Sequence, residues 1–256
     1  GVLAGDTIRS AADLNIPLVA VTLVSNKGYF RQILDSSGNQ IEHTEEWNPA
    51  HFMTHLTAEV SVKIQNREVK IRAWLYNCKS LTGGCVPIIF LDTDVEGNDP
   101  EDRKITDFLY GGDQRYRLKQ EIVLGIGGVR MLDELGFKIR KYHMNEGHSS
   151  LLGLELLRCN GIDPMKVKEL CIFTTHTPVE AGHDKFDYGL VEDLIRDKNC
   201  VDVLRRFGGA ERFNTSLFAL NLSNYINGVT KRHSLISSEL FPGYKIQAIT
   251  NGVHSY

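Results

Sequence analysis

A strand, a polar turn and a helix follow one another between residues 139 and 157, and this stretch constrains the fold more than any other. Its sequence is IRKYHMNEGHSSLLGLELL. The pattern predicts a strand over Ile139–Met144, a turn of sequence NEGH, and a helix that begins near Ser149 and is capped by Ser149 or Ser150. The turn therefore lies where the carboxyl end of a strand meets the amino end of a helix, which is where ligands bind in α/β folds.

Two later stretches have the same build. The apolar run Leu170–Phe173 precedes the residues TTHTP, and Ile246–Ile249 precedes the residues TNGVH. Because the carboxyl ends of parallel strands meet at one edge of a sheet, we expect the three turns to form one site. Turns rich in Asn and His suit a polyhydroxylated or anionic ligand better than they suit packing. The candidate ligand-binding residues of these turns are Asn145, His148, His176 and Asn251.

The remaining pattern alternates strands with helices. Buried strands are predicted at Ile16–Val24 and Val86–Asp92, and a long helix at Arg115–Leu135. Alternating apolar residues predict an antiparallel β excursion near residues 56–75. The expected fold is α/β, with a three-layer, doubly wound, mostly parallel sheet of the Rossmann-like kind.

Two glycine-containing segments need interpretation. The residues GIGG at 125–128 imitate a dinucleotide-binding fingerprint, but they lie inside the predicted helix rather than between a strand and a helix. We therefore expect them to allow close packing of that helix on the sheet. Asn227-Gly228 is typical of a turn and is expected to lead into a helix over Val229–Ser238.

Composition narrows the class of protein. The 256 residues carry a net charge of −3 without a polybasic run, which argues against nucleic acid or an anionic membrane as the main partner. No apolar run approaches the roughly 20 residues that span a bilayer. The five cysteines are an odd number without a C-x-x-C pair, which favours reduced thiols in a cytoplasmic protein.

Other chemistries fit the sequence less well. A metal site would draw on His143, His148, His176 and His183, but no pair has the spacing of H-E-x-x-H and no cysteine accompanies them. No G-x-S-x-G marks a serine hydrolase. No pair of catalytic carboxylates is obvious, as a two-carboxylate glycosidase would require. A metal centre is therefore not expected.

Several candidate residues also have simpler explanations. Asp113, after Gly111-Gly112, either caps a helix or belongs to a mobile gate that brings Asp113 and Arg117 to a pocket. Gly1, at the head of a predicted helix over Gly1–Leu14, is positioned to face a phosphate. Equally, His148 is interpretable as a capping or buried side chain, and the segments around His176 and Asn251 as plain polar turns.

Five segments, in this order along the chain, resemble the α-glucan phosphorylases, and the closer match is to the shorter bacterial and archaeal type. The opening GVLAGDTIRSAADL and the segment KGYFRQ fit the same family. The five segments are LYGGDQRYRLKQEIVLGIGGVRML (109–132), YHMNEGHSSLLGLELL (142–157), FTTHTPVEAGHDKF (173–186), NGVTKRHSLIS (227–237) and TNGVH (250–254).

The resemblance implies an architecture and a reaction. Residues 1–256 would be the N-terminal domain of a GT-B glycosyltransferase, incomplete at both ends, without the C-terminal domain whose lysine binds pyridoxal phosphate. The implied reaction is the reversible phosphorolysis of α-1,4-glucan (glycogen, starch or maltodextrin) to glucose 1-phosphate. We expect this piece alone to bind the cofactor poorly and to be inactive, and the complete protein to be cytoplasmic. The resemblance is compatible with a homo-oligomer.

The resemblance also implies roles for individual residues. His176 matches the histidine that holds the reacting glucose through its backbone carbonyl and ring. Asn251 matches an asparagine that bonds sugar hydroxyls, and Asn145 and His148 match the turn that lines the glucan side. Asp113 and Arg117 lie in the region of the family's gate. Gly1 matches the last glycine of a phosphate-facing loop.

Two other functions remain open. One is a nucleotide-sugar-dependent glucosyltransferase of the same GT-B build, which would use no pyridoxal. The other is a non-catalytic glucan-binding module.

Overall fold

The computed structural model describes residues 2–28, 31–45, 47–109 and 111–255. Helices and strands alternate along much of the chain, so the predicted α/β class is confirmed. The α-helices are α1 (Val2–Asp13), α2 (Gln114–Ile122), α3 (Gly128–Glu134), α4 (Leu152–Cys159), α5 (Pro164–Leu170), α6 (Tyr188–Ile195), α7 (Lys198–Gly208), α8 (Thr215–Asn221) and α9 (Lys231–Leu240). Shorter helical turns are η1 (Pro49–His51), the π-helical η2 (Val123–Gly127), η3 (Gly147–Ser149) and η4 (Glu180–Gly182).

The described strands form two four-stranded sheets and two separate antiparallel pairs. One sheet has the order β1-β6-β5-β4, the other β12-β11-β8-β7, and β2–β3 and β9–β10 pair separately. The strands are β1 (Ala20–Leu23), β2 (Arg31–Leu34), β3 (Gln40–His43), β4 (Thr54–Ile64), β5 (Arg67–Lys79), β6 (Cys85–Asp92), β7 (Tyr142–Asn145), β8 (Cys171–Thr174), β9 (Lys185–Asp187), β10 (Arg212–Asn214), β11 (Tyr225–Gly228) and β12 (Gln247–Ala248).

The first sheet contains the predicted antiparallel excursion. Strands β4 and β5 pair antiparallel, β5 and β6 pair antiparallel, and β6 pairs parallel with β1. Gln65 and Asn66 connect β4 to β5 with φ angles of 53° and 63°. Positive φ at both central residues is typical of the type I′ hairpin turn, whose twist matches that of the flanking strands.

The second sheet is parallel throughout. Its inner strand β11 contains Asn227-Gly228, which we predicted to be a turn, so that prediction was wrong. Tyr225 and Ile226 pair with β8, and Asn227 and Gly228 pair with β12. A strand with neighbours on both sides satisfies its backbone groups in the ladder, and this outweighs the local preference of Asn-Gly for a turn.

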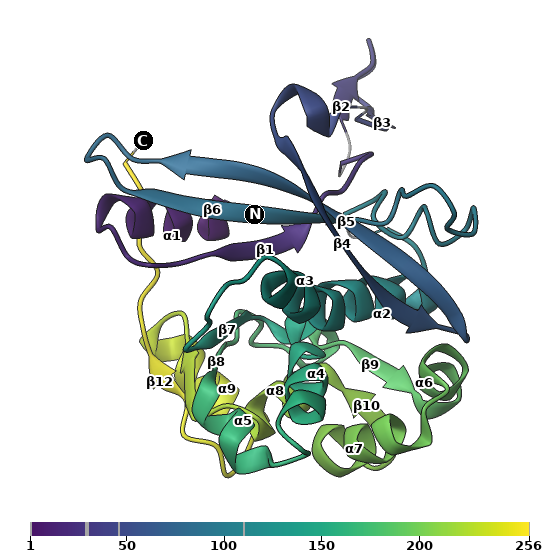
Figure 1. The fold of residues 1–256 in the computed structure, drawn as a ribbon. Helices are drawn as coiled ribbons and strands as arrows, with labels where there is room; N and C mark the ends of the chain where they lie inside the picture. The colour runs from purple at the N-terminus through teal and green to yellow at the C-terminus, as the bar shows by residue number, and fades with distance from the viewer. Residues whose placement is uncertain (1, 29–30, 46, 110, 256) are drawn as a thin grey trace.

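The structure therefore contains two four-stranded sheets where we predicted one continuous sheet. Figure 1 shows α2 and α3 lying between them, with β1, β6, β5 and β4 on one side and α4, β7 and β8 on the other. These helices and both sheets share one hydrophobic core. The second sheet, parallel with crossover helices, is compatible with a Rossmann-like arrangement.

Glycines let the helical segment from α2 to α3 approach both of its neighbours. A Cβ on Gly127 would lie 2.5 Å from Ile71 Cδ1 on β5, and one on Gly125 would lie 2.6 Å from the Leu152 backbone nitrogen on α4. Neither distance is possible for a real Cβ without movement. The predicted packing role of GIGG is confirmed, and the segment is helical rather than a dinucleotide-binding turn.

Candidate functional site

The turns after β7, β8 and β12 lie at the same edge of the second sheet, as the sequence predicted. All neighbouring pairs in the order β12-β11-β8-β7 are parallel, so the carboxyl ends of these strands point the same way. The first two turns follow neighbouring strands, and the third follows the strand beyond β11. The contacts between the turns after β7 and β8 therefore form the centre of the candidate site.

Glu146 joins these two turns. One of its carboxylate oxygens, Oε2, accepts hydrogen bonds from the His176 backbone N–H at 2.7 Å and from Thr177 Oγ1 at 3.2 Å. The other, Oε1, accepts one from the Gly147 backbone N–H at 3.0 Å. The Glu146 backbone N–H itself donates to the Thr174 carbonyl at 2.9 Å. One half-buried residue thus contacts the turn after β8 through both its side chain and its backbone.

The backbone of Glu146 is strained. Its φ of 76° and ψ of 166° fall in a region that is essentially reserved for glycine. Such a conformation costs about 1–3 kcal/mol and persists only where the surroundings hold it. Gly147 follows with no room for a side chain, because a Cβ there would lie 2.6 Å from Thr215 Oγ1 on α8. The predicted turn is therefore present, and the helix after it begins at Leu152 without a serine cap.

His176 offers an unused hydrogen-bonding atom at this edge. Its Nε2 is buried and has no hydrogen-bond partner among the described residues. Burial lowers the pKa of His176, and the nearby His233 lowers it further, although the Glu146 carboxylate acts in the opposite direction. The ring is therefore neutral near pH 7. A buried polar atom without a protein partner is unusual in a native protein, and such an atom can bind a ligand or a water molecule.

Side chains beneath the edge form a short relay. His143 Nε2 lies 2.7 Å from Thr174 Oγ1, which donates to Asn227 Oδ1 at 2.9 Å. The Asn227 carbonyl also accepts from the Thr175 backbone N–H at 3.0 Å. The relay fixes β7, β8 and β11 to one another just below the His176 turn. Sequence reasoning missed Asn227 because it assigned that residue to a turn.

His148 lies among charged side chains contributed by other segments. Burial lowers its pKa, and the charges that act on the ring include those of Glu146, Arg117 and Asp184. Arg117 Nε and Nη2 donate to the two oxygens of Asp184 at 2.9 Å and 2.7 Å. This bidentate pair holds Arg117 of α2 within electrostatic range of His148, and its role in a pocket stays a prediction.

Asp113 is the amino-terminal cap of α2. Its Oδ1 accepts from the Tyr116 backbone N–H at 2.9 Å, and the residue is exposed. This is the capping arrangement that the sequence left open as one of two explanations. Its role as part of a gate stays a prediction.

Glu121 is a buried acid next to the Arg117–Asp184 pair. It is 2% exposed, and neither carboxylate oxygen has a hydrogen-bond partner among the described residues. Arg117 Nε lies 3.9 Å from Glu121 Oε1. Burial and the Asp184 charge raise the pKa of Glu121 well above its usual value. Burial beside another carboxyl group therefore favours the protonated form of Glu121.

Replacing Glu121 by glutamine is expected to stabilise the protein at pH 7. Above about pH 4.5 the unfolded chain releases the Glu121 proton whereas the native chain retains it, so native stability falls as pH rises through this window. Glutamine carries no such proton. We expect Glu121→Gln to raise the free energy of unfolding at pH 7 by about 1–2 kcal/mol, measured by urea denaturation.

Two comparisons test the cause of this gain. The advantage of Glu121→Gln should vanish below about pH 4, where both states of the wild type hold the proton. Glu134→Gln, at an exposed position on α3, should change stability little at either pH. An equal gain from Glu121→Gln at pH 3.5 and pH 7 would contradict the explanation.

The predicted residues that have not yet been placed are Asn145, Asn251 and Gly1. Asn145 and Asn251 are exposed, and the Asn251 backbone N–H donates to the Val229 carbonyl just after β11, at 3.1 Å. The third turn therefore stays at the edge. Gly1 lies outside the described residues.

His183 was considered only as a metal ligand, yet it belongs to the same neighbourhood. Its Nδ1 lies 2.8 Å from Ser216 Oγ, and its buried Nε2 has no partner among the described residues. It lines a cavity of about 280 Å³ together with residues from η4, α8 and the end of α9. The edge of Phe241 packs on its ring, with 5.1 Å between centroids. The spacing of His183 from His176 in the sequence gave no sign of this cavity.

A metal site and a membrane-spanning helix were both considered from the sequence. No group of three or more His, Cys, Asp or Glu side chains in this part of the chain is placed to hold a metal ion. None of its helices combines the length and the apolar character that crossing a membrane requires.

Pyridoxal phosphate binds enzymes through a lysine amine. In the described ranges the buried lysine is Lys119, whose Nζ is ion-paired with Asp102 at 3.1 Å. Lys119 is thus not placed to form a Schiff base, and the position of the cofactor lysine stays a prediction.

Comparison with known proteins confirms the resemblance seen in the sequence. The chain is 38% identical to the maltodextrin phosphorylase of Thermococcus litoralis over all of this chain and 33% of that protein. It is 35% identical to the glycogen phosphorylase of Mycobacterium tuberculosis over all of this chain and 34% of that protein. With the glycogen phosphorylase of Aquifex aeolicus it shares 30% identity over 99% of this chain and 40% of that protein. No protein-family model matches the chain.

These similarities extend along the whole sequence but cover only part of each relative. The chain spans between 33% and 40% of the length of these three proteins. The activity of a complete protein is therefore a matter for proposal.

Proposed function

We propose that this chain is part of an α-glucan phosphorylase of the short bacterial and archaeal type, which is a glycosyltransferase. The complete protein would transfer a terminal glucosyl group of an α-1,4-glucan to inorganic phosphate and release glucose 1-phosphate, reversibly. Residues 1–256 would belong to its N-terminal GT-B domain. A C-terminal domain would supply the pyridoxal phosphate lysine, so this piece alone would be inactive.

The observation that carries the proposal is the pairing of the turns after β7 and β8 through Glu146. It places His176, with its buried and unpartnered Nε2, at the carboxyl edge of a parallel sheet. A neutral imidazole can donate to or accept from a sugar hydroxyl. A backbone carbonyl in the same turn can face the positive charge that develops at the anomeric carbon during glucosyl transfer.

The other predicted residues take supporting roles in this proposal. Asn145 and His148 would line the glucan side of the site, and Asn251 would bond sugar hydroxyls. Arg117, held by Asp184, would present a fixed positive charge near His148. Asp113 would belong to the gate, and Gly1 would face phosphate.

The localisation and the partners of the complete protein follow from the same proposed function. We infer a cytoplasmic enzyme of carbohydrate metabolism, with glucan and phosphate as its substrates. Neither nucleic acid nor a membrane would be a partner, and assembly into a homo-oligomer would be compatible with this function.

The direct test uses the complete protein. Incubation with maltodextrin and inorganic phosphate should release glucose 1-phosphate, and the purified protein should show the absorbance of bound pyridoxal. A nucleotide-sugar-dependent glucosyltransferase would instead release a nucleoside diphosphate and lack that absorbance. A glucan-binding module would retain maltodextrin on a column without turnover.

Within that test, His176→Ala is expected to lower kcat/KM for phosphorolysis by about 100-fold or more. The reason is that removal of one preorganised group facing the reacting sugar costs a similar factor in other enzymes. His51→Ala, at an exposed position in η1, is the matched control and should leave kcat/KM unchanged. Unchanged phosphorolysis in His176→Ala would remove His176 from the site and favour the binding-module alternative.

A further inference from the structure

The two turns of the candidate site are held together by one acid that the sequence analysis did not select. The Glu146 carboxylate accepts from backbone N–H groups on both sides of the contact, from Gly147 in its own turn and from His176 in the turn after β8. Thr177 Oγ1 adds a third hydrogen bond. Both carboxylate oxygens therefore accept hydrogen bonds, two from backbone N–H groups and one from a hydroxyl.

This arrangement requires a carboxylate rather than any polar side chain. Glutamine has the same shape but only one oxygen, so its amide NH₂ would face either the Gly147 N–H or the His176 N–H. Two donors cannot share a hydrogen bond. An uncharged isostere therefore loses either the bond from Gly147 within its own turn or the acceptor that faces His176 and Thr177 in the other turn.

The backbone supports the same interpretation. Glu146 occupies a conformation that suits glycine, with φ at 76° and ψ at 166°. A residue with a side chain is strained there, so something must hold it in place. The hydrogen bonds from His176 and Thr177, which lie 30 and 31 residues along the chain, are the long-range contacts that do so.

We propose that Glu146 is a positioning residue for the reaction at His176. Its carboxylate fixes the backbone of the His176–Thr177 turn, and with it the carbonyl and the ring that face the sugar. The kinetic consequence rests on the proposed function, whereas the mechanical coupling of the two turns does not. An experiment can therefore reject the kinetic role of Glu146 and still confirm that Glu146 couples the two turns.

Electrostatics gives a second, independent readout. The negative charge of Glu146 raises the pKa of His148, His176 and His183, each of which burial lowers. Removal of that charge should shift all three histidine titrations to lower pH. A residue that only filled space would leave these titrations in place when replaced by an isostere.

The experiment compares Glu146→Gln, Glu146→Gly and Glu180→Gln. Glycine adopts the native φ and ψ without strain, so Glu146→Gly should keep the fold even if Glu146→Gln loses it. Glu180→Gln is the matched control for the His148 and His176 readouts, because Glu180 lies in η4, its side chain is 71% exposed and it pairs with Lys185.

In the 256-residue chain we expect the His176 amide to exchange at least tenfold faster in Glu146→Gly than in the wild type, as measured by NMR. The His176 ring should titrate at lower pH in both Glu146 variants. In the complete protein, Glu146→Gln should lower kcat for phosphorolysis about tenfold and change KM much less, because a displaced turn affects the transition state more than glucan binding.

Three outcomes are informative. If amide exchange, ring titration and kcat all match the wild type in the Glu146 variants, the proposal is overturned. If the complete wild-type protein releases no glucose 1-phosphate, the proposed function fails, and the exchange and titration data still decide whether Glu146 couples the turns. If Glu180→Gln has the same effects as Glu146→Gln, the effects do not come from the Glu146 contacts and the proposal is also overturned.

Discussion

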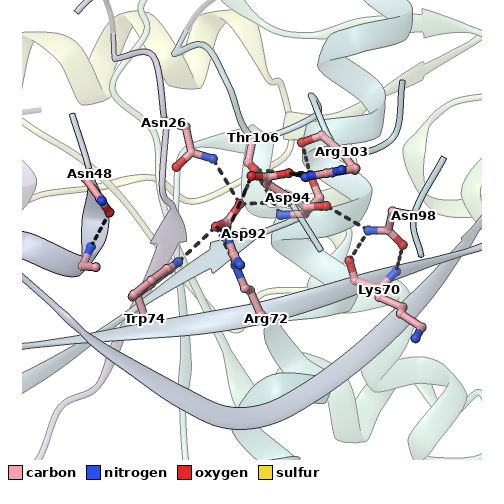
Figure 2. Close-up of polar contacts among 12 residues, drawn as sticks. Asn26, Asn48, Lys70, Arg72, Trp74, Asp92, Asp94, Asn98, Arg103 and Thr106 are labelled. Carbon is pink, nitrogen blue, oxygen red and sulfur yellow. Dashed lines mark hydrogen bonds and ion pairs between the residues drawn. The ribbon is translucent and has the colours of Figure 1, made fainter. Parts of the chain in front are cut away.

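Replacing Asp92 by alanine is expected to lower the free energy of unfolding by about 3–5 kcal/mol, because it leaves the partly buried Arg72 guanidinium and several buried hydrogen-bond donors without their partner. Asp92 ends β6 and is fully buried. Its Oδ2 accepts from Arg72 Nε at 2.9 Å and from Trp74 Nε1 at 3.0 Å. Figure 2 shows the carboxylate at the centre of these contacts.

The other oxygen of Asp92 is used as fully as the first. Oδ1 accepts from Asn26 Nδ2 at 3.1 Å, from the Asp94 backbone N–H at 2.9 Å and from Thr106 Oγ1 at 3.2 Å. These partners lie after β1, after β6 and in the loop before α2 (Figure 2). A substitution at Asp92 therefore breaks the link between that loop and the first sheet, and it leaves several donors unpaired.

Acid should remove most of this difference. Burial by itself would raise the pKa of Asp92, but the hydrogen bonds from Asp94 and Trp74 and the charge of Arg72 outweigh it and lower the pKa. A depressed folded-state pKa contributes stability above the unfolded value of 3.8 that is lost as pH falls through the folded value. The gap between wild type and Asp92→Ala should therefore narrow in strong acid.

Denaturant unfolding of the 256-residue chain at pH 7 measures the effect. The control is Asp94→Ala, two residues along, whose carboxylate is 41% exposed and pairs with Arg103 at the surface. An exposed pair of this kind contributes about 0–1 kcal/mol. If the two variants lost the same stability, the buried network would not be what holds this region together.

Elements governed by local pattern were predictable from the sequence. The apolar run that became β6, the alternation that became β4 and β5, and the helical spacing of α2 and α3 each depend on neighbours within a few residues. The common edge of the turns after β7, β8 and β12 was also predictable, because parallel strands with crossover helices leave little choice of topology.

Contacts between distant residues were not predictable from one sequence. The carboxylate of Glu146 meets the His176 backbone 30 residues away, and Arg117 meets Asp184 67 residues away. Neither spacing carries a signal in a periodic pattern. The positive φ of Glu146 is likewise invisible, since nothing about a glutamate indicates a glycine-like backbone. The strand β11 was missed because an Asn-Gly pair favours a turn until neighbouring strands supply partners.

A second large effect is expected from Gly125→Ala, which should lower the free energy of unfolding by about 3 kcal/mol through overpacking. A Cβ at this position would lie 2.6 Å from the backbone nitrogen of Leu152 and 2.7 Å from the carbonyl carbon of Leu151. Backbone atoms cannot rotate away as the end of a side chain can. The helical segment and α4 must therefore move apart.

The position of this contact ties stability to the candidate site. Leu151 and Leu152 begin the helix that follows the NEGH turn, so a displacement there should be transmitted to His148, three residues earlier. We expect the His148 amide resonance to shift in Gly125→Ala along with the loss of stability. Denaturant unfolding and a two-dimensional NMR spectrum of the same sample would measure both.

Gly127→Ala separates a clash with backbone from a clash with a side chain. Its added Cβ would lie as close to a neighbour, 2.5 Å, but that neighbour is Ile71 Cδ1, the end of a side chain on β5. Rotation of Ile71 can relieve part of the overlap, whereas the backbone of Leu151 and Leu152 beside Gly125 cannot rotate away. Gly127→Ala should therefore lose less stability than Gly125→Ala and leave His148 unshifted. If the two variants were equally destabilised and both moved the His148 signal, the coupling between α4 and the site would not depend on the Gly125–Leu152 contact.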